Sequence, residues 1–99
     1  MTVLVIMTVP GDTDQFEAFM KSRASEVIEL SEKAKAMGAM GHRFAISDGH
    51  VIAVDYWESA ERFQEFISAP ELQAVMAEMG ARGEPQVTIA MAKGFPGEF

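Results

Sequence analysis

The side chains best suited to chemistry are a histidine, an aspartate and a tryptophan that flank one predicted turn. His42 precedes the dipeptide Asp48-Gly49, and Asp55 and Trp57 follow it. Asp-Gly between two apolar runs indicates a two-residue β-hairpin loop, because a type I′ turn needs residues that accept φ > 0. This loop places His42 opposite Asp55, on one face of the sheet and with Cβ atoms about 5 Å apart. A carboxylate there can fix the tautomer of the imidazole, so the pair predicts a general base.

The same register predicts an apolar binding site around the histidine. Met40 is expected opposite Trp57, and Phe44 opposite Ala53, so their side chains share one face. Trp57 would give a flat ligand an aromatic wall. The predicted substrate-binding side chains on this hairpin are therefore Trp57, Phe44 and Met40. A structural interpretation of the histidine–aspartate pair stays open, because such pairs also fix strand register or a dimer interface.

One further binding candidate lies in the first helical segment. Apolar residues recur there at helical spacing, at Phe16, Phe19, Met20, Val27, Leu30, Ala34 and Met37. Arg23 interrupts this stripe. Its aliphatic stem can cover apolar surface while the guanidinium stays in water, or the cation can face the pocket. Arg23 is therefore included among the predicted substrate-binding residues.

The elements that must position these side chains follow from the pattern of apolar residues. Strands are expected at 3–9, 39–47, 50–57 and 86–93. Between the first two strands we expect one helix, capped by Thr13 or Asp14 and ended by Gly38. A helix capped by Ser59 follows the third strand, and Pro70 begins another. The order predicts an α+β, ferredoxin-like βαββαβ fold with an antiparallel four-stranded sheet.

The predicted sheet is apolar on both faces. The first strand carries Val3 and Val5 on one face but Leu4 and Ile6 on the other. Helices can cover only one face, and exposed apolar patches this large are rare in monomers. We therefore expect a homodimer in which the second face packs against its copy. The alternative cover is the C-terminal tail, GFPGEF, folded back across the sheet.

Composition narrows the classes of function. The 99 residues predict a single domain spanning 1–99. Fifteen acidic and eight basic residues give a net charge of −7, which argues against nucleic acid and anionic membranes as partners. The chain has no cysteine and only two histidines, and none of the usual metal-site spacings, so no metal site is predicted. Without a basic leader or a long apolar run, the expected location is cytoplasmic.

Residues 41–76 resemble the antibiotic biosynthesis monooxygenase-like family of dimeric α+β barrels. The resemblance rests on Trp-Glu-Ser at 57–59, Ala-Glu-Arg-Phe at 60–63 and Ala-Pro at 69–70. With the βαββαβ order, it extends over nearly the whole chain. It implies a dimeric α+β barrel, and an activity drawn from a varied group that includes cofactor-free oxidation of polycyclic anthrones, haem degradation and quinol chemistry.

Two departures from the family patterns matter. Its haem-degrading members pair the Trp of this strand with an Asn and a His, but this chain has no Asn and no His between Ser59 and Met79. Haem degradation is therefore disfavoured. The anthrone oxygenases also use an Asn and Tyr residues, and here the single tyrosine, Tyr56, is expected on the strand face opposite Trp57.

Three functions are consistent with these residues. The first is a cofactor-independent monooxygenase, or related enzyme, that uses His42 and Asp55 on a small aromatic or quinone-like molecule. The second is a non-catalytic dimer that binds a small aromatic ligand in the same pocket. The third is a structural dimer in which the two side chains only lock the sheet.

Overall fold

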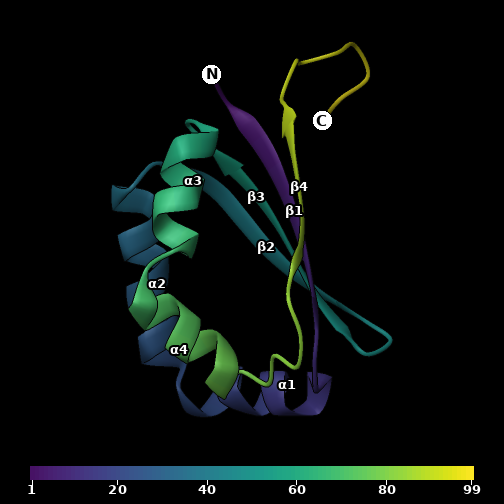
Figure 1. Cartoon of the computed structure of the whole chain (residues 1–99). Helices are drawn as coiled ribbons and strands as arrows, with labels where there is room; N and C mark the ends of the chain where they lie inside the picture. Colours follow the sequence, from purple (N-terminus) through teal and green to yellow (C-terminus); the bar gives the residue numbers. More distant parts are fainter.

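The computed structural model describes all 99 residues. They form a four-stranded antiparallel sheet with helices on one side (Figure 1). The elements in chain order are β1 Val3–Pro10, α1 Thr13–Ser22, α2 Ala24–Ala36, β2 Ala39–Ser47, β3 His50–Trp57, α3 Ala60–Ile67, α4 Pro70–Glu78 and β4 Gln86–Met91. The strand order across the sheet is β2-β3-β1-β4. This arrangement confirms the predicted α+β, ferredoxin-like fold, with each connecting helical segment divided into two helices. None of these helices combines the length and the apolar character needed to cross a membrane.

The β2–β3 hairpin forms in the predicted register. Ser47 pairs with His50, and His42 pairs with Asp55. The loop therefore has the expected two residues. Its predicted type was wrong, because only Gly49 has a positive φ, of 72°, and type I′ requires positive values at both loop positions.

A β-bulge changes the pairing near the start of β2. Ala39, rather than Met40, pairs with Trp57, and Gly41 pairs with Tyr56. Met40 is the extra residue between these two pairs, and it is 62% exposed. The predicted Met40–Trp57 pair was therefore wrong, because a constant two-residue alternation cannot anticipate an inserted residue.

The helical segment after β1 is two helices instead of the one predicted. Its N-cap is Asp12, whose side chain accepts a hydrogen bond from the Gln15 amide at 3.0 Å, and neither Thr13 nor Asp14 fills this role. The break falls at Arg23, which has the non-helical angles φ −126° and ψ 38°. The predicted caps at Gly38 and Ser59 and the predicted helix start at Pro70 are confirmed.

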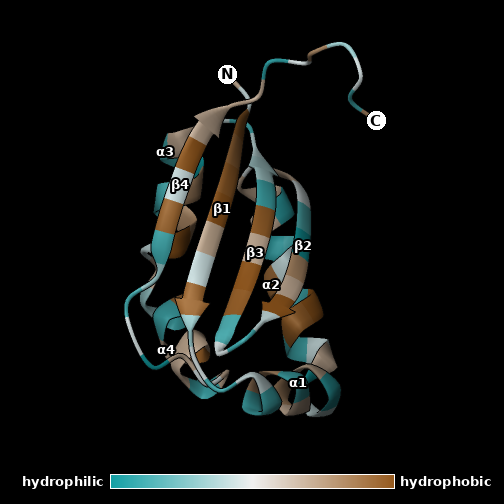
Figure 2. Cartoon of the chain, turned by 90° about the vertical axis from the view of Figure 1, so that its right-hand side faces the viewer, coloured by the Kyte–Doolittle hydropathy of each residue, from teal (hydrophilic) through white to brown (hydrophobic).

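The two faces of the sheet differ in their cover. The helices lie over the face that carries Val3, Val5 and Trp57, which form the buried core together with Phe63. The other face has no helix against it, and Figure 2 shows its apolar strands turned toward the viewer with the helices behind. The C-terminal tail extends past the end of the sheet in both views, so the alternative in which the tail covers this face is excluded.

A close backbone contact closes the end of the molecule where β1 leads into α1. Gly11 pairs with Ala81, and the Asp12 amide donates to the Gly80 carbonyl at 3.0 Å. A Cβ atom on Gly11 would lie 2.5 Å from the Gly80 oxygen, a backbone atom that cannot move without opening this corner. Position 11 therefore has room only for glycine.

Gly11→Ala is expected to lower the free energy of unfolding by at least about 1 kcal/mol, because the corner must separate to admit the methyl group. Gly41→Ala is the matched control, since its Cβ would make an ordinary 3.6 Å contact with Tyr56. Urea unfolding of both variants measures the difference. Equal stabilities would contradict the packing described for this corner.

Candidate functional site

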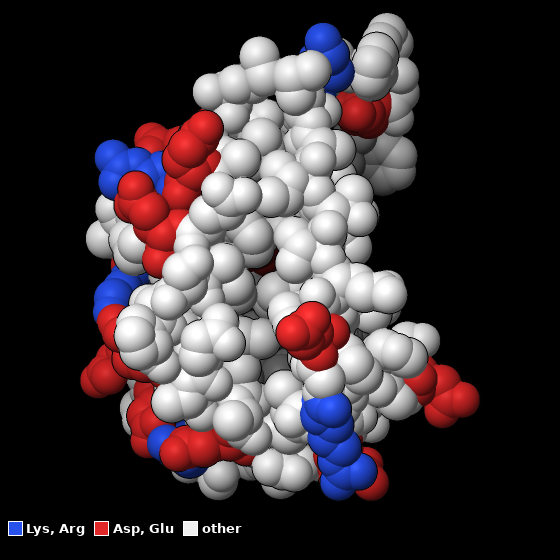
Figure 3. Space-filling view, in the orientation of Figure 1, with Lys and Arg blue, Asp and Glu red and all other residues white.

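A cavity of about 630 Å³ separates the sheet from the helices. Fifteen of its twenty lining residues are hydrophobic, so it suits an organic ligand better than an ion. Six of the eight elements line it, namely β1, β2, β3, α2, α3 and α4, whereas α1 and β4 do not. The helix α2 has no buried residue, because its inner side faces this space. Figure 3 shows a hollow among uncharged atoms, with the charged side chains gathered mainly over the helices.

Asp55 holds the polar centre of this cavity. The residue is only 8% exposed, and its Oδ2 accepts a hydrogen bond from Trp57 Nε1 at 3.1 Å. Its Oδ1 contacts Nδ1 of His42, the residue directly opposite in the hairpin. Both carboxylate oxygens are therefore satisfied by neighbouring side chains, as a buried charge requires.

These contacts decide which nitrogen of His42 can act as a base. An ionised carboxylate only accepts hydrogen bonds, so the proton of the neutral imidazole lies on Nδ1. Nε2 then carries the lone pair. The His42 side chain is 37% exposed and lines the cavity, so a bound molecule can reach the ring.

Aromatic side chains form the walls on both sides of this polar centre. Trp57 is 1% exposed, and its ring centroid lies 5.7 Å from that of Phe63 and 5.4 Å from that of Phe66. The Phe44 ring meets the His42 ring edge-on, at 4.3 Å between centroids. The arrangement offers flat, apolar surfaces next to one basic nitrogen.

The structure brings together five of the six predicted site residues. The residues that line the cavity are His42, Asp55, Trp57, Phe44 and Met40. Met40 takes part although it is the bulge residue. Arg23 does not line the cavity, and the interpretation of its cation as facing the pocket was wrong.

Arg23 instead ties the helices to one another. Its guanidinium donates hydrogen bonds to Glu26 and to Glu78, and it lies 4.6 Å from the centre of the Phe19 ring. The hydrogen bonds to Glu26 and then to Glu78 raise the pKa of Arg23 above its ordinary value. The hydrogen bond from Arg23 lowers the pKa of Glu26 below its ordinary value. Arg23 is therefore a structural residue that joins α1, α2 and α4.

The helices contribute site residues that the hairpin argument missed. The apolar helical residues that line the cavity are Val27, Leu30 and Ala34 of α2, Phe63, Phe66 and Ile67 of α3, Leu72 and Met76 of α4, and Met79 at the C-cap of α4. Their helical periodicity marked them as inward-facing, but periodicity does not distinguish a packed core from a hollow one. Ser31 and Lys35 add polar atoms from α2, and Lys35 is the only cationic side chain in the lining.

An ion pair helps to hold the helical layer over the cavity. Lys33 of α2 contacts Glu71 of α4, so it bridges two helices that both line the cavity. The hydrogen bond from Lys33 lowers the pKa of Glu71 below its ordinary value. Both side chains are about half exposed, so the pair positions the helices more than it stabilises the fold.

The donor set of the cavity suits proton transfer. No cluster of three His, Cys, Asp or Glu side chains that could hold a metal ion occurs in the chain. The lining combines one imidazole and one carboxylate with apolar and aromatic surface. This arrangement can bind a flat molecule and remove one proton from it.

Asp55→Ala is expected to lower the free energy of unfolding by about 1–3 kcal/mol, because it leaves the buried Trp57 N–H without an acceptor. Glu65→Ala, at an exposed carboxylate of α3, is the control and should change stability little. Thermal unfolding followed by fluorescence of Trp57, the only tryptophan, measures both. If the two variants unfold alike, Asp55 does not organise the site.

Comparison with known proteins identifies the fold of this chain. No family model and no curated protein matches the sequence. Among solved structures, an antibiotic biosynthesis monooxygenase is similar over 93% of this chain and 99% of its own, with 12% identity and a TM-score of 0.65. A dimeric ferredoxin-like protein from an uncultured marine organism is similar over 95% and 90%, with 18% identity and a TM-score of 0.63.

A third solved structure is SnoaB, a cofactor-independent oxygenase from Streptomyces nogalater. It is similar over 98% of this chain and 96% of its own, with 14% identity and a TM-score of 0.55. At these identities the likeness shows the fold. The chain therefore has an antibiotic biosynthesis monooxygenase-like fold, and its chemistry depends on the side chains in its own cavity.

Proposed function

We propose that this protein is a cofactor-independent oxygenase for small aromatic, quinone-like molecules, with His42 as its general base. The observation that carries the proposal is the imidazole fixed through Nδ1 by a buried carboxylate, inside a cavity lined mostly by apolar side chains. The volume of about 630 Å³ lies within the range of about 300–1,000 Å³ typical of small-molecule sites. The similarity to a cofactor-independent oxygenase supports the same class of reaction.

The proposed reaction needs only substrate, dioxygen and the base. His42 Nε2 takes a proton from an activated CH₂ carbon beside a phenolic ring system, and the resulting carbanion transfers one electron to dioxygen. The radical pair combines into a C–O bond, and the imidazolium returns its proton to give a hydroperoxide. Loss of the second C–H proton then forms the carbonyl and breaks the O–O bond, releasing water. One CH₂ group and one O₂ thus give one C=O group and one H₂O.

The surrounding side chains assist at defined points. Asp55 stabilises the imidazolium that forms when His42 takes the proton, because its carboxylate lies against Nδ1. Trp57 and the Phe residues around the cavity exclude water from the carbanion and bind the ring system by apolar contact. Lys35, also in the lining, pairs with Glu32 at 3.2 Å and would have to leave this contact to meet a phenolate oxygen of such a substrate.

His42→Ala is expected to reduce oxygen consumption at least about 100-fold, which is the usual contribution of a positioned general base. The assay follows O₂ uptake with panels of anthrones and hydroquinones. His50→Ala is the matched control, because the only other histidine lies beside the hairpin turn, is exposed and contacts the Asp48 carbonyl. It should retain wild-type rates.

Two results would contradict the catalytic proposal. In the first, His42→Ala consumes oxygen as fast as the wild type. In the second, a panel compound quenches Trp57 fluorescence and raises the melting temperature but is never converted, which would show a binding protein without catalysis.

We also propose that the uncovered face of the sheet pairs with the same face of a second copy. Ile6 is 37% exposed and Tyr56 is 46% exposed on this face, with Leu4, Ile52 and Val54 half-buried beside them. Arg43 is the only charged residue that the strand registers place there. A face this apolar fits a self-complementary partner. The dimeric ferredoxin-like protein of similar fold supports the same assembly.

Ile6→Lys is expected to convert a dimer into a folded monomer, because two copies of the charge would be buried against each other. Ile28→Lys, at a residue of α2 that is 60% exposed, is the control and should leave the dimer intact. Sedimentation equilibrium at micromolar concentration measures both. A wild-type protein that sediments as a monomer would contradict the proposed dimer.

A further inference from the structure

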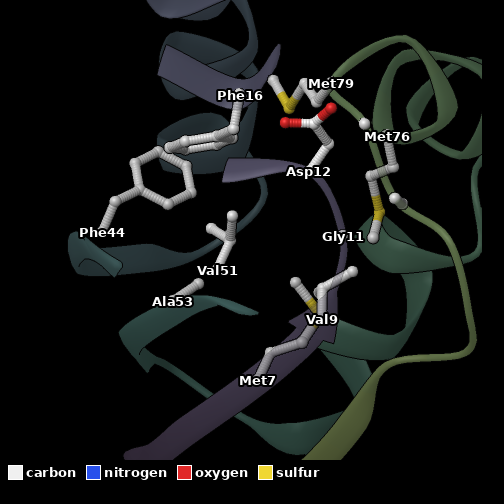
Figure 4. A pocket seen from close by; sticks show the side chains of 12 residues that line it. Met7, Val9, Gly11, Asp12, Phe16, Phe44, Val51, Ala53, Met76 and Met79 are labelled. Carbon is white, nitrogen blue, oxygen red and sulfur yellow. The ribbon is translucent and has the colours of Figure 1, made fainter. Parts of the chain in front are cut away.

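A second, smaller cavity of about 60 Å³ lies where β1 leads into α1 and where α4 ends. Nine of its twelve lining residues are hydrophobic. Figure 4 shows the rings of Phe16 and Phe44 beside each other on one side of this space and Met76 on another, with Val51 between them. We call this space the annex. It is distinct from the main cavity in size and in most of its lining.

The polar groups around the annex already have partners. Asp12 is its only charged side chain, and Oδ1 of this residue accepts from the Gln15 amide while Oδ2 contacts Arg82. The Gly11 amide donates to the Gly49 carbonyl, and the Asp12 amide donates to the Gly80 carbonyl, both at 3.0 Å. A buried water needs two to four hydrogen-bonding partners, so this lining holds water poorly.

The size of the annex restricts its occupant. An engineered apolar cavity of about 150 Å³ accepts benzene or xenon, and the annex has well under half of that volume. The annex is partly open to solvent, so its enclosed part accepts a diatomic molecule or a single heavy-gas atom, whereas an aromatic ring would protrude from it. The ligand class is a small apolar gas.

The annex adjoins the main cavity. Five side chains line both spaces, namely Met7, Phe44, Ala53, Met76 and Met79. Phe44 spans the boundary, because its ring lies 5.3 Å from that of Phe16 and 4.3 Å from that of His42. These shared side chains separate the annex from the part of the main cavity that contains His42.

We propose that the annex is a binding site for dioxygen, which it supplies to the carbanion formed at His42. The inference rests on the proposed function for the identity of the gas, since dioxygen is the second substrate of that reaction. The inference that a gas binds there rests only on the lining and the volume of the annex. Apolar lining, a volume suited to a diatomic molecule and a shared wall with the catalytic cavity all lead to the same occupant.

Xenon is the probe for the site, because it binds in apolar cavities without any chemistry. Crystals of the wild-type protein pressurised with xenon should show a xenon atom in the annex. Crystals of Val51→Phe should not, because the larger side chain fills the annex. Val51 lines the annex but not the main cavity. Val87→Phe is the matched control, since Val87 is 42% exposed on β4 and lines neither cavity. Val51→Leu replaces Val51→Phe if the larger ring prevents folding.

Kinetics then test the role of the site. Val51→Phe should raise the apparent KM for dioxygen several-fold and leave the KM for the aromatic substrate unchanged, while Val87→Phe should change neither. Xenon absent from the annex of the wild type would overturn the inference. So would a Val51→Phe variant that changes only the KM for the aromatic substrate, because the annex would then hold part of that substrate. Xenon in the annex without oxygen consumption on any panel compound would instead contradict the proposed function and leave a gas site in place.

Discussion

The site depends on one buried carboxylate. Asp55 cannot remain charged in an apolar cavity without partners, and it finds them in the Trp57 indole and the His42 imidazole. These two contacts set the orientation of the tryptophan ring and the tautomer of the histidine. Asp55 therefore fixes both the aromatic wall formed by Trp57 and the basic nitrogen of His42, so a change at Asp55 affects both.

The fold leaves space where a small protein normally has its core. Only 12 of the 99 residues are buried, and α2 buries none, because the helices stand away from the sheet around the cavity. Ion pairs at the helix surfaces, from Arg23 to Glu78 and from Lys33 to Glu71, help to keep this layer in place. Such a chain gains little stability from its interior, which explains why its second sheet face is apolar and available for a partner.

Local patterns predicted the parts of the site that depend on local geometry. The Asp-Gly loop fixed the strand register, so the contact between His42 and Asp55 followed from the sequence. Met40 was misplaced because a β-bulge is not encoded in the alternation of apolar residues. Arg23 was misread because its partner Glu78 is distant in sequence. The helical side of the main cavity and the annex could not be predicted, since a helical stripe has the same periodicity whether it packs tightly or lines a void.

The tautomer of His42 is the most direct test of its role as the base. Long-range ¹H–¹⁵N correlation spectra of the ¹⁵N-labelled protein at neutral pH distinguish a protonated ring nitrogen from one with a free lone pair. We expect His42 to carry its proton on Nδ1 and a lone pair on Nε2, and Asp55→Ala to abolish this preference. A wild-type His42 with its proton on Nε2 would rule out His42 Nε2 as the base, because that nitrogen could then accept no proton.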